Sequence, residues 1–163
     1  MKFFLSPFAI LLIIHSNCAP AIGRELIELK REDSKSVPAM VYKPNINECR
    51  GVAIISHGAG GSEKGYNYLG TAMSDFGYLA LVVGHQESGL QAVQEQISGK
   101  TLSEGLAKLI TTPKAYQGRF MDIAVAKEWA QGQCTSKASV LIGHSMGAAT
   151  VMMAAGARNK LNM

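Results

Sequence analysis

The sequence predicts an α/β protein with a mostly parallel sheet. Three short apolar runs without alternation have the composition of strands covered on both faces, at residues 52–55, 78–83 and 139–142. Segments with apolar residues at helical spacing lie between and after these runs, at residues 64–75, 119–131 and 148–157. Because parallel neighbours need a crossover connection, this alternation favours a parallel sheet over one built from hairpins.

An antiparallel hairpin is expected ahead of the parallel strands. Residues 24–31 alternate between apolar and polar side chains, which is typical of a half-exposed strand. A Glu-Asp-Ser turn follows, and residues 37–42 form a second strand that Pro44 ends. We expect this hairpin to form one edge of the sheet.

The chain is long enough for one domain with a single sizeable core. Residues 22–163 are predicted to form this domain, with no internal repeat and no low-complexity segment. Within it, residues 87–117 form a looser excursion that holds a short helix near residues 102–110, and Pro113 ends this helix.

The first 21 residues have the pattern of a secretory signal peptide. A positively charged start leads into an apolar run at residues 3–14, and Ala19 and Ala21 make a small-residue cleavage site. The run is shorter than the about 20 residues that a spanning helix needs, so no stable membrane span is expected after cleavage behind Ala21. We expect a secreted or periplasmic protein, with lipid attachment at Cys18 as the alternative. The intact mass of the exported protein checks this, and a product that keeps its first 21 residues contradicts it.

Charge and histidine spacing argue against two kinds of site. The net charge is +4, but the basic residues are scattered, so no nucleic-acid surface is expected. The four histidines are isolated and no Cys/His spacing suits zinc, so no structural metal is expected. After signal removal, Cys49 and Cys134 remain as an even pair in an oxidising compartment.

One serine lies between a buried strand and a helix in the pattern Gly-x-Ser-x-Gly. The residues of this motif are Gly143, His144, Ser145, Met146 and Gly147. A sharp strand-to-helix turn holds a seryl hydroxyl clear of the sheet, where a base can reach it, and tolerates only small flanking residues. The pattern therefore predicts Ser145 as a nucleophile. The alternative is a glycine-rich turn that carries an idle serine.

A second glycine-rich segment follows the first buried strand. Its residues are His57, Gly58, Ala59, Gly60 and Gly61. Small residues at the end of a strand leave backbone N–H groups able to face a ligand. The phosphate-binding patterns Gly-x-Gly-x-x-Gly and Gly-Lys-Ser/Thr are absent, which disfavours a phosphate site. A plain flexible loop is the other alternative.

The two motifs and their separation resemble the α/β-hydrolase superfamily, and most nearly its dienelactone hydrolases and platelet-activating-factor acetylhydrolase-like esterases. These families carry a similar His-Gly-x-Gly-Gly-Ser loop and a Gly-His-Ser-x-Gly elbow, and many have an Arg and an Asp spaced as Arg119 and Asp122 are. The resemblance covers the sequence from about residue 24 to its last residue. It implies an α/β-hydrolase fold and a serine hydrolase that acts on a small-molecule ester without a cofactor.

The resemblance also implies the roles of the motif residues. Ser145 would attack the ester carbonyl carbon. The backbone N–H groups of Ala59 and Met146 would form the oxyanion hole, with Gly60 as the alternative to Ala59. Peptidase, thioesterase and acyltransferase activities stay open, because specificity depends on loops outside the two motifs.

The sequence departs from the family at the base and the acid. The family order is Ser, then Asp or Glu, then His, yet residues 146–163 contain none of these three residue types after the serine. His57 and His144 lie within the motifs and are expected to pack and hydrogen-bond. His85 follows a strand two places from the nucleophile strand, which puts it roughly 10 Å to the side. The catalytic triad is therefore incomplete in this sequence.

Two hypotheses follow from the incomplete triad. One is that these residues are the N-terminal part of a hydrolase, inactive and poorly stable alone because the nucleophile strand would be an unpaired apolar edge. The other is a non-catalytic remnant or binding protein of the same fold.

The usual sheet order of the family makes the strands after Cys49 and Cys134 parallel neighbours. Each cysteine lies just upstream of its strand, so both would lie near the same end of the sheet. A disulfide is sterically possible there and would close a long loop, so we expect one.

Overall fold

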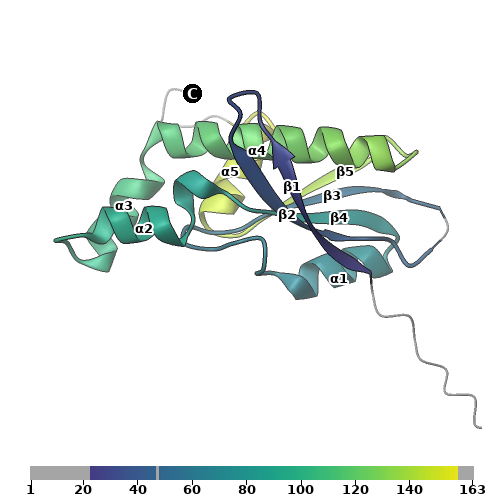
Figure 1. Cartoon of the computed structure of the whole chain (residues 1–163), viewed down its shortest axis with the longest axis horizontal. Helices are drawn as coiled ribbons and strands as arrows, with labels where there is room; N and C mark the ends of the chain where they lie inside the picture. The colour runs from purple at the N-terminus through teal and green to yellow at the C-terminus, as the bar shows by residue number, and fades with distance from the viewer. Residues whose placement is uncertain (1–22, 47, 158–163) are drawn as a thin grey trace, which may run out of the picture.

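The computed structural model describes residues 23–46 and 48–157, which form one five-stranded sheet flanked by helices (Figure 1). The strands are β1 Arg24–Lys30, β2 Ser36–Tyr42, β3 Gly51–Ser56, β4 Tyr78–Val83 and β5 Ser139–Gly143. Their order is β1-β2-β4-β3-β5, in which β4, β3 and β5 are parallel and β1 and β2 antiparallel. The predicted fold class and edge hairpin are confirmed. The predicted signal peptide lies outside the described residues.

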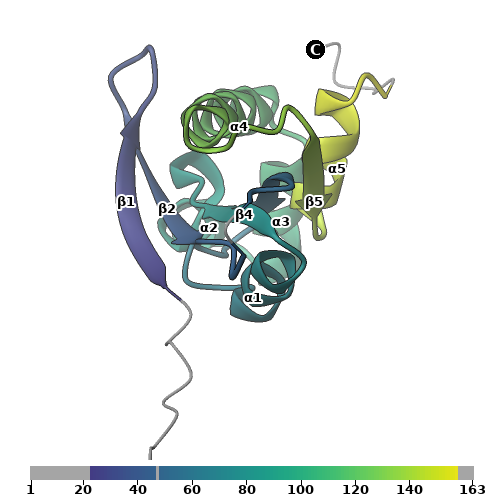
Figure 2. The same cartoon turned by 90° about the vertical axis from the view of Figure 1, so that its right-hand side faces the viewer.

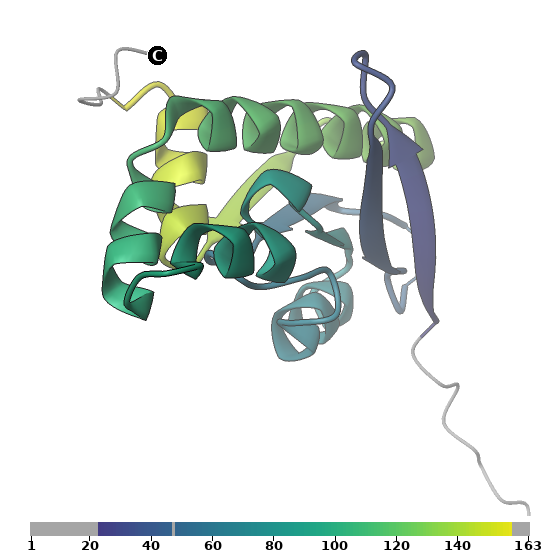
Figure 3. The same ribbon diagram turned by 60° about the vertical axis from the view of Figure 1, so that its left-hand side comes forward.

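The helices lie on the two faces of the sheet and at one end of the molecule. They are α1 Asn67–Asp75, the short 3₁₀ helix η1 Gln86–Ser88, α2 Leu90–Ile97, α3 Leu102–Ile110, α4 Pro113–Gln133 and α5 Met146–Ala154. α4 and α5 pack on one face of the sheet and α1 on the other (Figure 2). α2 and α3 lie together at one end of the molecule, beside α5 (Figure 3). Across the described ranges, none of the helices combines the length and apolar character that crossing a membrane requires.

The central strands are apolar on both faces because each face is covered. Alternate residues of a strand point to opposite faces. Val52, Ile54 and Leu81 pack against Ile123 and Ala126 of α4. The intervening Ala53, Ile55, Ala80 and Val82 pack with Leu69 and Met73 of α1. This two-sided burial accounts for the unbroken apolar runs in the sequence.

The excursion after β4 is more ordered than the sequence indicates. The predicted helix near residues 102–110 is present as α3, but the expected loose segment before it contains α2. Leu90, Val93 and Ile97 have the helical spacing that identifies α2 in retrospect. The predicted short helix ends ahead of Pro113 as expected, but the next helix, expected from residue 119, already begins at Pro113. Proline suits this position, since its missing N–H would have no helical partner there.

β5, the strand that leads to Ser145, lies at one edge of the sheet. Among the described strands, β5 pairs only with β3. Val140 on β5 is 36% exposed, whereas Ile54 on β3 is fully buried. An edge position for β5 was expected, and the low stability expected from it stays a prediction.

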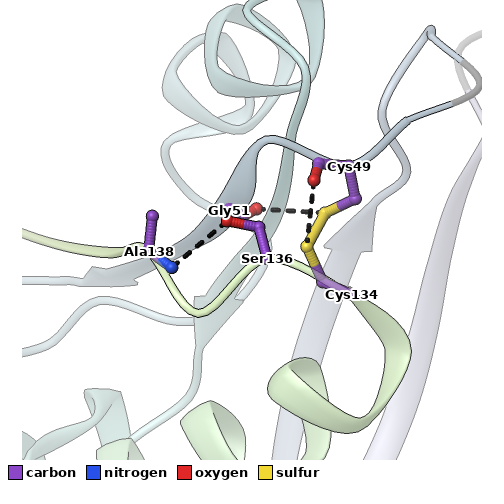
Figure 4. Close-up of a disulfide and its surroundings, with 5 residues drawn as sticks. All are labelled: Cys49, Gly51, Cys134, Ser136 and Ala138. Carbon is purple, nitrogen blue, oxygen red and sulfur yellow. Dashed lines mark hydrogen bonds between the residues drawn. A yellow bond between two sulfur atoms is a disulfide. The ribbon is translucent and has the colours of Figure 1, made fainter.

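The structure contains the expected disulfide between Cys49 and Cys134 (Figure 4). Cys49 precedes β3 and Cys134 follows α4, and their Cα atoms are 5.6 Å apart. Next to the disulfide, the N–H of Val52 donates to the carbonyl of Ala138 at 2.9 Å, where β5 is about to begin. The bridge therefore ties the end of α4 to the start of the β3–β5 pair.

Reduction of this disulfide is expected to lower the free energy of unfolding by about 2–4 kcal/mol, because the bridge restricts the unfolded chain over a sequence separation of 85 residues. Urea unfolding with and without a reductant measures the difference. The double variant Cys49→Ser/Cys134→Ser is the control, since a reductant should not shift its midpoint. Two titratable thiols in the unreduced, unfolded wild type would contradict the pairing.

Candidate active site

Ser145 lies in a sharp turn between β5 and α5. Its backbone has φ 54° and ψ −122°, a conformation that residues other than glycine rarely adopt. Its side chain is exposed, although Met146 and Gly147 next to it are buried. The turn thus lifts the serine out of the sheet directly before the first residue of α5, as a nucleophile elbow does.

Two glycines allow this turn to pack closely. A side chain at Gly143 would lie 2.3 Å from the carbonyl oxygen of Gly147. A side chain at Gly147 would lie 2.0 Å from the carbonyl oxygen of Ser56, at the end of β3. Only hydrogen fits at either position, so α5 starts in direct backbone contact with β3.

The glycine-rich loop after β3 lies beside the serine. Ser56 is paired with Gly143 in the parallel register, so the loop and the elbow leave the sheet at the same edge. A side chain at Gly58 would lie 3.3 Å from Ser145 Cβ. The structure therefore brings the two sequence motifs together.

The backbone N–H groups of the loop differ in availability. Gly60 has φ 76° and its N–H donates to the carbonyl of Ser88 at 2.8 Å. The N–H of Gly61 donates to the carbonyl of Gly58 at 3.1 Å. Within the described ranges, no hydrogen bond engages the N–H of Ala59. The side chains of Ala59 and Met146 pack in one apolar cluster, together with residues of α2 and α3.

A cleft of about 490 Å³ adjoins the glycine-rich loop. Gly60 and Gly61 line it on the loop side, Gly84 and His85 at the end of β4, and Leu90 at the start of α2. It opens at the carboxyl ends of the parallel strands, where α/β proteins commonly bind ligands.

The described histidines have partners other than Ser145. His57 is buried and its Nδ1 is 2.6 Å from the carbonyl of Gly58. His85 is buried between the Ser56 hydroxyl at 2.8 Å from Nε2 and the Asp122 carboxylate at 2.9 Å from Nδ1. Burial lowers the pKa of His57 to about 3 and, with the nearby charge of Arg119, lowers the pKa of His85 well below its usual value. Both imidazoles are therefore neutral and enclosed.

His144 is exposed and contacts a residue that sequence analysis missed. Its Nδ1 is 2.8 Å from the phenolic oxygen of Tyr66, and a hydrogen bond joins them. Tyr66 has φ 57°, unusual for a bulky residue, at the start of α1. No short-range sequence signal marks this position, because the partner lies 78 residues away.

A buried polar network lies beneath the loop and the elbow. Its members are Arg31, Ser56, His85, Glu87, Ser88, Arg119 and Asp122. Arg31 donates to Asp122 at 3.0 Å and to Glu87 at 2.7 Å, which joins the β1–β2 turn to α4 and η1. In sequence, only the spacing of Arg119 and Asp122 indicated any part of this network. Within residues 23–46 and 48–157, no group of three or more His, Cys, Asp or Glu side chains is arranged to hold a metal ion.

Comparison with protein-family models finds no match, and comparison with curated proteins finds none either. Comparison with solved structures does find similar folds. The chain is similar to an α/β serine hydrolase homologue from Coxiella burnetii (TM-score 0.58, 16% identity), over 80% of this chain and 56% of that one. It is also similar to a cold-adapted esterase from an Arctic intertidal metagenomic library (0.61, 13%), over 79% and 53% of the two chains.

A third similar structure is the acylaminoacyl peptidase of Pyrococcus horikoshii, with a TM-score of 0.59 and 17% identity over 84% of this chain and 21% of that one. The chain spans about half the length of the first two structures. At these identities the likeness establishes the fold, which is the α/β-hydrolase fold.

Proposed function

We propose that this chain carries the nucleophile and the oxyanion site of a serine hydrolase that cleaves carboxylic esters of small molecules. The observation that carries the proposal is the backbone of Ser145, held at φ 54° at the start of α5 with the glycine-rich loop against it. A strained, exposed serine between a buried strand and a helix N-terminus has a clear chemical use and no evident structural one.

The geometry supports an acyl-transfer mechanism. Ser145 Oγ would attack the ester carbonyl carbon, and the carbonyl oxygen would gain negative charge in the tetrahedral intermediate. The N–H groups of Ala59 and Met146 would stabilise that charge, helped by the positive end of α5. Ala59 suits this role better than Gly60, because the N–H of Gly60 already donates to Ser88.

The remaining steps need a proton carrier. Loss of the alcohol would leave an acyl group on Ser145, and water would then release the acid. A histidine and an acid outside the described residues would take the proton from Ser145 and return it, since the two buried histidines are enclosed by other partners. The mechanism uses neither a metal nor another cofactor.

The proposal of an ester substrate is supported by one of the similar structures, which is described as an esterase. Of the other two, one is described as a serine hydrolase homologue and one as a peptidase. The cleft beside Gly60 and Gly61 adjoins the glycine-rich loop, but Ser145, Ala59 and Met146 are not among its lining residues. We also propose export, because the signal pattern precedes a domain with a disulfide, a combination typical of oxidising compartments.

The second candidate is a non-catalytic remnant or binding protein of the same fold. The observation that favours it is that no histidine of the described ranges hydrogen-bonds to Ser145. The cleft could then bind a small molecule without turnover.

Labelling with a fluorophosphonate probe tests the proposal. In protein produced from the gene with its natural flanking sequence, the probe should modify Ser145, and Ser145→Ala should lower labelling and ester hydrolysis by at least about 10³-fold. Ser139→Ala is the matched control, since Ser139 is an exposed serine on β5, the strand that leads to Ser145. Equal labelling of Ser145→Ala would contradict the nucleophile, and an unlabelled wild type would favour the binding protein.

A further inference from the structure

We propose that Arg119 is a positioning residue for the oxyanion site, whose buried guanidinium fixes the backbone of the His57–Gly61 loop on both sides of Ala59. The inference rests on the proposed function and deepens it. The inference is based on the hydrogen bonds that join the Arg119 side chain to the end of β3, to the glycine-rich loop and to η1.

The guanidinium of Arg119 reaches the start of the loop from α4. The side chain is fully buried. Nη1 donates to the carbonyl of His57 at 2.7 Å and to the hydroxyl of Ser56 at 3.2 Å. The first of these bonds orients the peptide group that begins the glycine-rich loop.

The same guanidinium reaches the far side of the loop through η1. Nε donates to the hydroxyl of Ser88 at 2.8 Å. The carbonyl of Ser88 in turn accepts the N–H of Gly60 at 2.8 Å. Ala59 lies between the two anchored residues, His57 and Gly60. The direction of its N–H is therefore set by contacts that both lead back to Arg119.

The charge of Arg119 adds to this arrangement. Burial lowers its pKa to about 10, so the side chain stays a cation at neutral pH. Among the ion pairs of the described residues, none involves Arg119, and its Nη2 has no hydrogen-bond partner there. A buried cation without a paired carboxylate is unfavourable for the fold itself, and such groups are common at functional sites. A cation below the loop would favour negative charge on an oxygen bound above it.

Arg119→Met and Arg119→Lys separate positioning from simple packing. Methionine fills much of the space but cannot donate, whereas a lysine ammonium can reach the His57 carbonyl or Ser88 but not span both. Two quantities are measured in protein produced from the gene with its natural flanking sequence, namely the rate of fluorophosphonate labelling at Ser145 and the amide hydrogen exchange of Gly60. The exchange of Leu81 in β4 reports on the fold as a whole. Lys114→Met, an exposed residue of α4, is the matched control.

In Arg119→Met we expect labelling to slow by about 10²- to 10³-fold, the size of losing one oxyanion-hole donor. Exchange at Gly60 should rise at least about tenfold relative to Leu81, and Arg119→Lys should fall between methionine and wild type. Parallel changes at Gly60 and Leu81, or labelling at the wild-type rate, would overturn the inference. If wild type is not labelled but Gly60 exchange responds as expected, the hydrolase proposal fails while positioning of the loop by Arg119 is supported. If Arg119→Met does not fold, Arg119→Lys alone decides between these outcomes.

Discussion

Gly147→Ala is expected to lower the free energy of unfolding by several kcal/mol and to abolish labelling of Ser145. The added Cβ would lie 2.0 Å from the carbonyl oxygen of Ser56 and 2.7 Å from that of His57. Both atoms belong to the backbone, so no side-chain rotation relieves the overlap. Either α5 moves away from β3 or the β3 end moves away from the sheet, and overpacking of this severity exceeds the usual cost of about 1–3 kcal/mol.

Gly132→Ala is the control for this prediction. Gly132 lies in α4, and an added Cβ there meets no atom within 4 Å. Alanine is better than glycine in a helix by about 0.5–1 kcal/mol, so this variant should keep or slightly raise stability. Urea unfolding of wild type and the two variants gives the comparison. A Gly147→Ala protein within about 1 kcal/mol of wild type would mean that α5 does not start in contact with β3.

Strands and motifs were predictable because their signals are local. The apolar runs at β3, β4 and β5 follow directly from two-sided burial, which needs no knowledge of the partners. The elbow was found because Gly143 and Gly147 flank a serine at a strand-to-helix junction. In the structure, a side chain at either position would overlap backbone atoms. The edge hairpin was found from its alternation and its turn.

Helix boundaries were predicted less well, because the same local residue pattern can indicate either the start or the end of a helix. Pro113 indicated the end of α3 correctly, but it is also the first residue of α4, since proline both terminates helices and suits their first residue. α2 was missed although Leu90, Val93 and Ile97 have helical spacing, because the rest of the segment is mostly polar. In the structure, only Val93 of the three is buried. In such a short helix the apolar pattern is brief.

The contacts that shape the site could not be predicted from the sequence. Arg119 meets His57 across 62 residues, Arg31 meets Asp122 across 91, and Tyr66 meets His144 across 78. A single sequence contains no signal for such pairs, since each polar residue is as compatible with solvent as with a buried partner. The motifs therefore located the groups proposed to react, while the side chains that hold them are visible only in the structure.

Arg31→Met is expected to lower the free energy of unfolding by about 3–5 kcal/mol at pH 8, because it leaves a buried carboxylate without its cation. The side chains of Arg31 and Asp122 are both 2% exposed and 3.0 Å apart. Glu87, 15% exposed, loses its bond to Arg31 as well. Lys30→Met makes the same kind of change on the exposed face of β1 and should have little effect.

The decrease in the free energy of unfolding caused by Arg31→Met should be smaller at pH 5 than at pH 8. Burial raises the pKa of Asp122 to about 7, while the hydrogen bond from Arg31 acts to lower it. A carboxyl whose folded-state pKa exceeds its unfolded value binds a proton more tightly when folded, so this group favours folding as pH falls through 7 toward 4. Without Arg31 the pKa of Asp122 rises further, and at pH 5 the folded variant holds a neutral acid that needs no cation.

The titration of Glu87 determines the lowest pH at which this comparison can be made. Burial opposes ionisation of Glu87, but hydrogen bonds from Arg31 and Lys35 lower its pKa to about 2. Its contribution to stability is present above its unfolded pKa of about 4.3 and is lost as pH falls toward 2, so pH 5 lies above that window. Urea unfolding of wild type, Arg31→Met and Lys30→Met at pH 5 and pH 8 gives the test. An Arg31→Met loss that is equal at the two pH values, or larger at pH 5, would show that the Asp122 carboxylate is not what Arg31 neutralises.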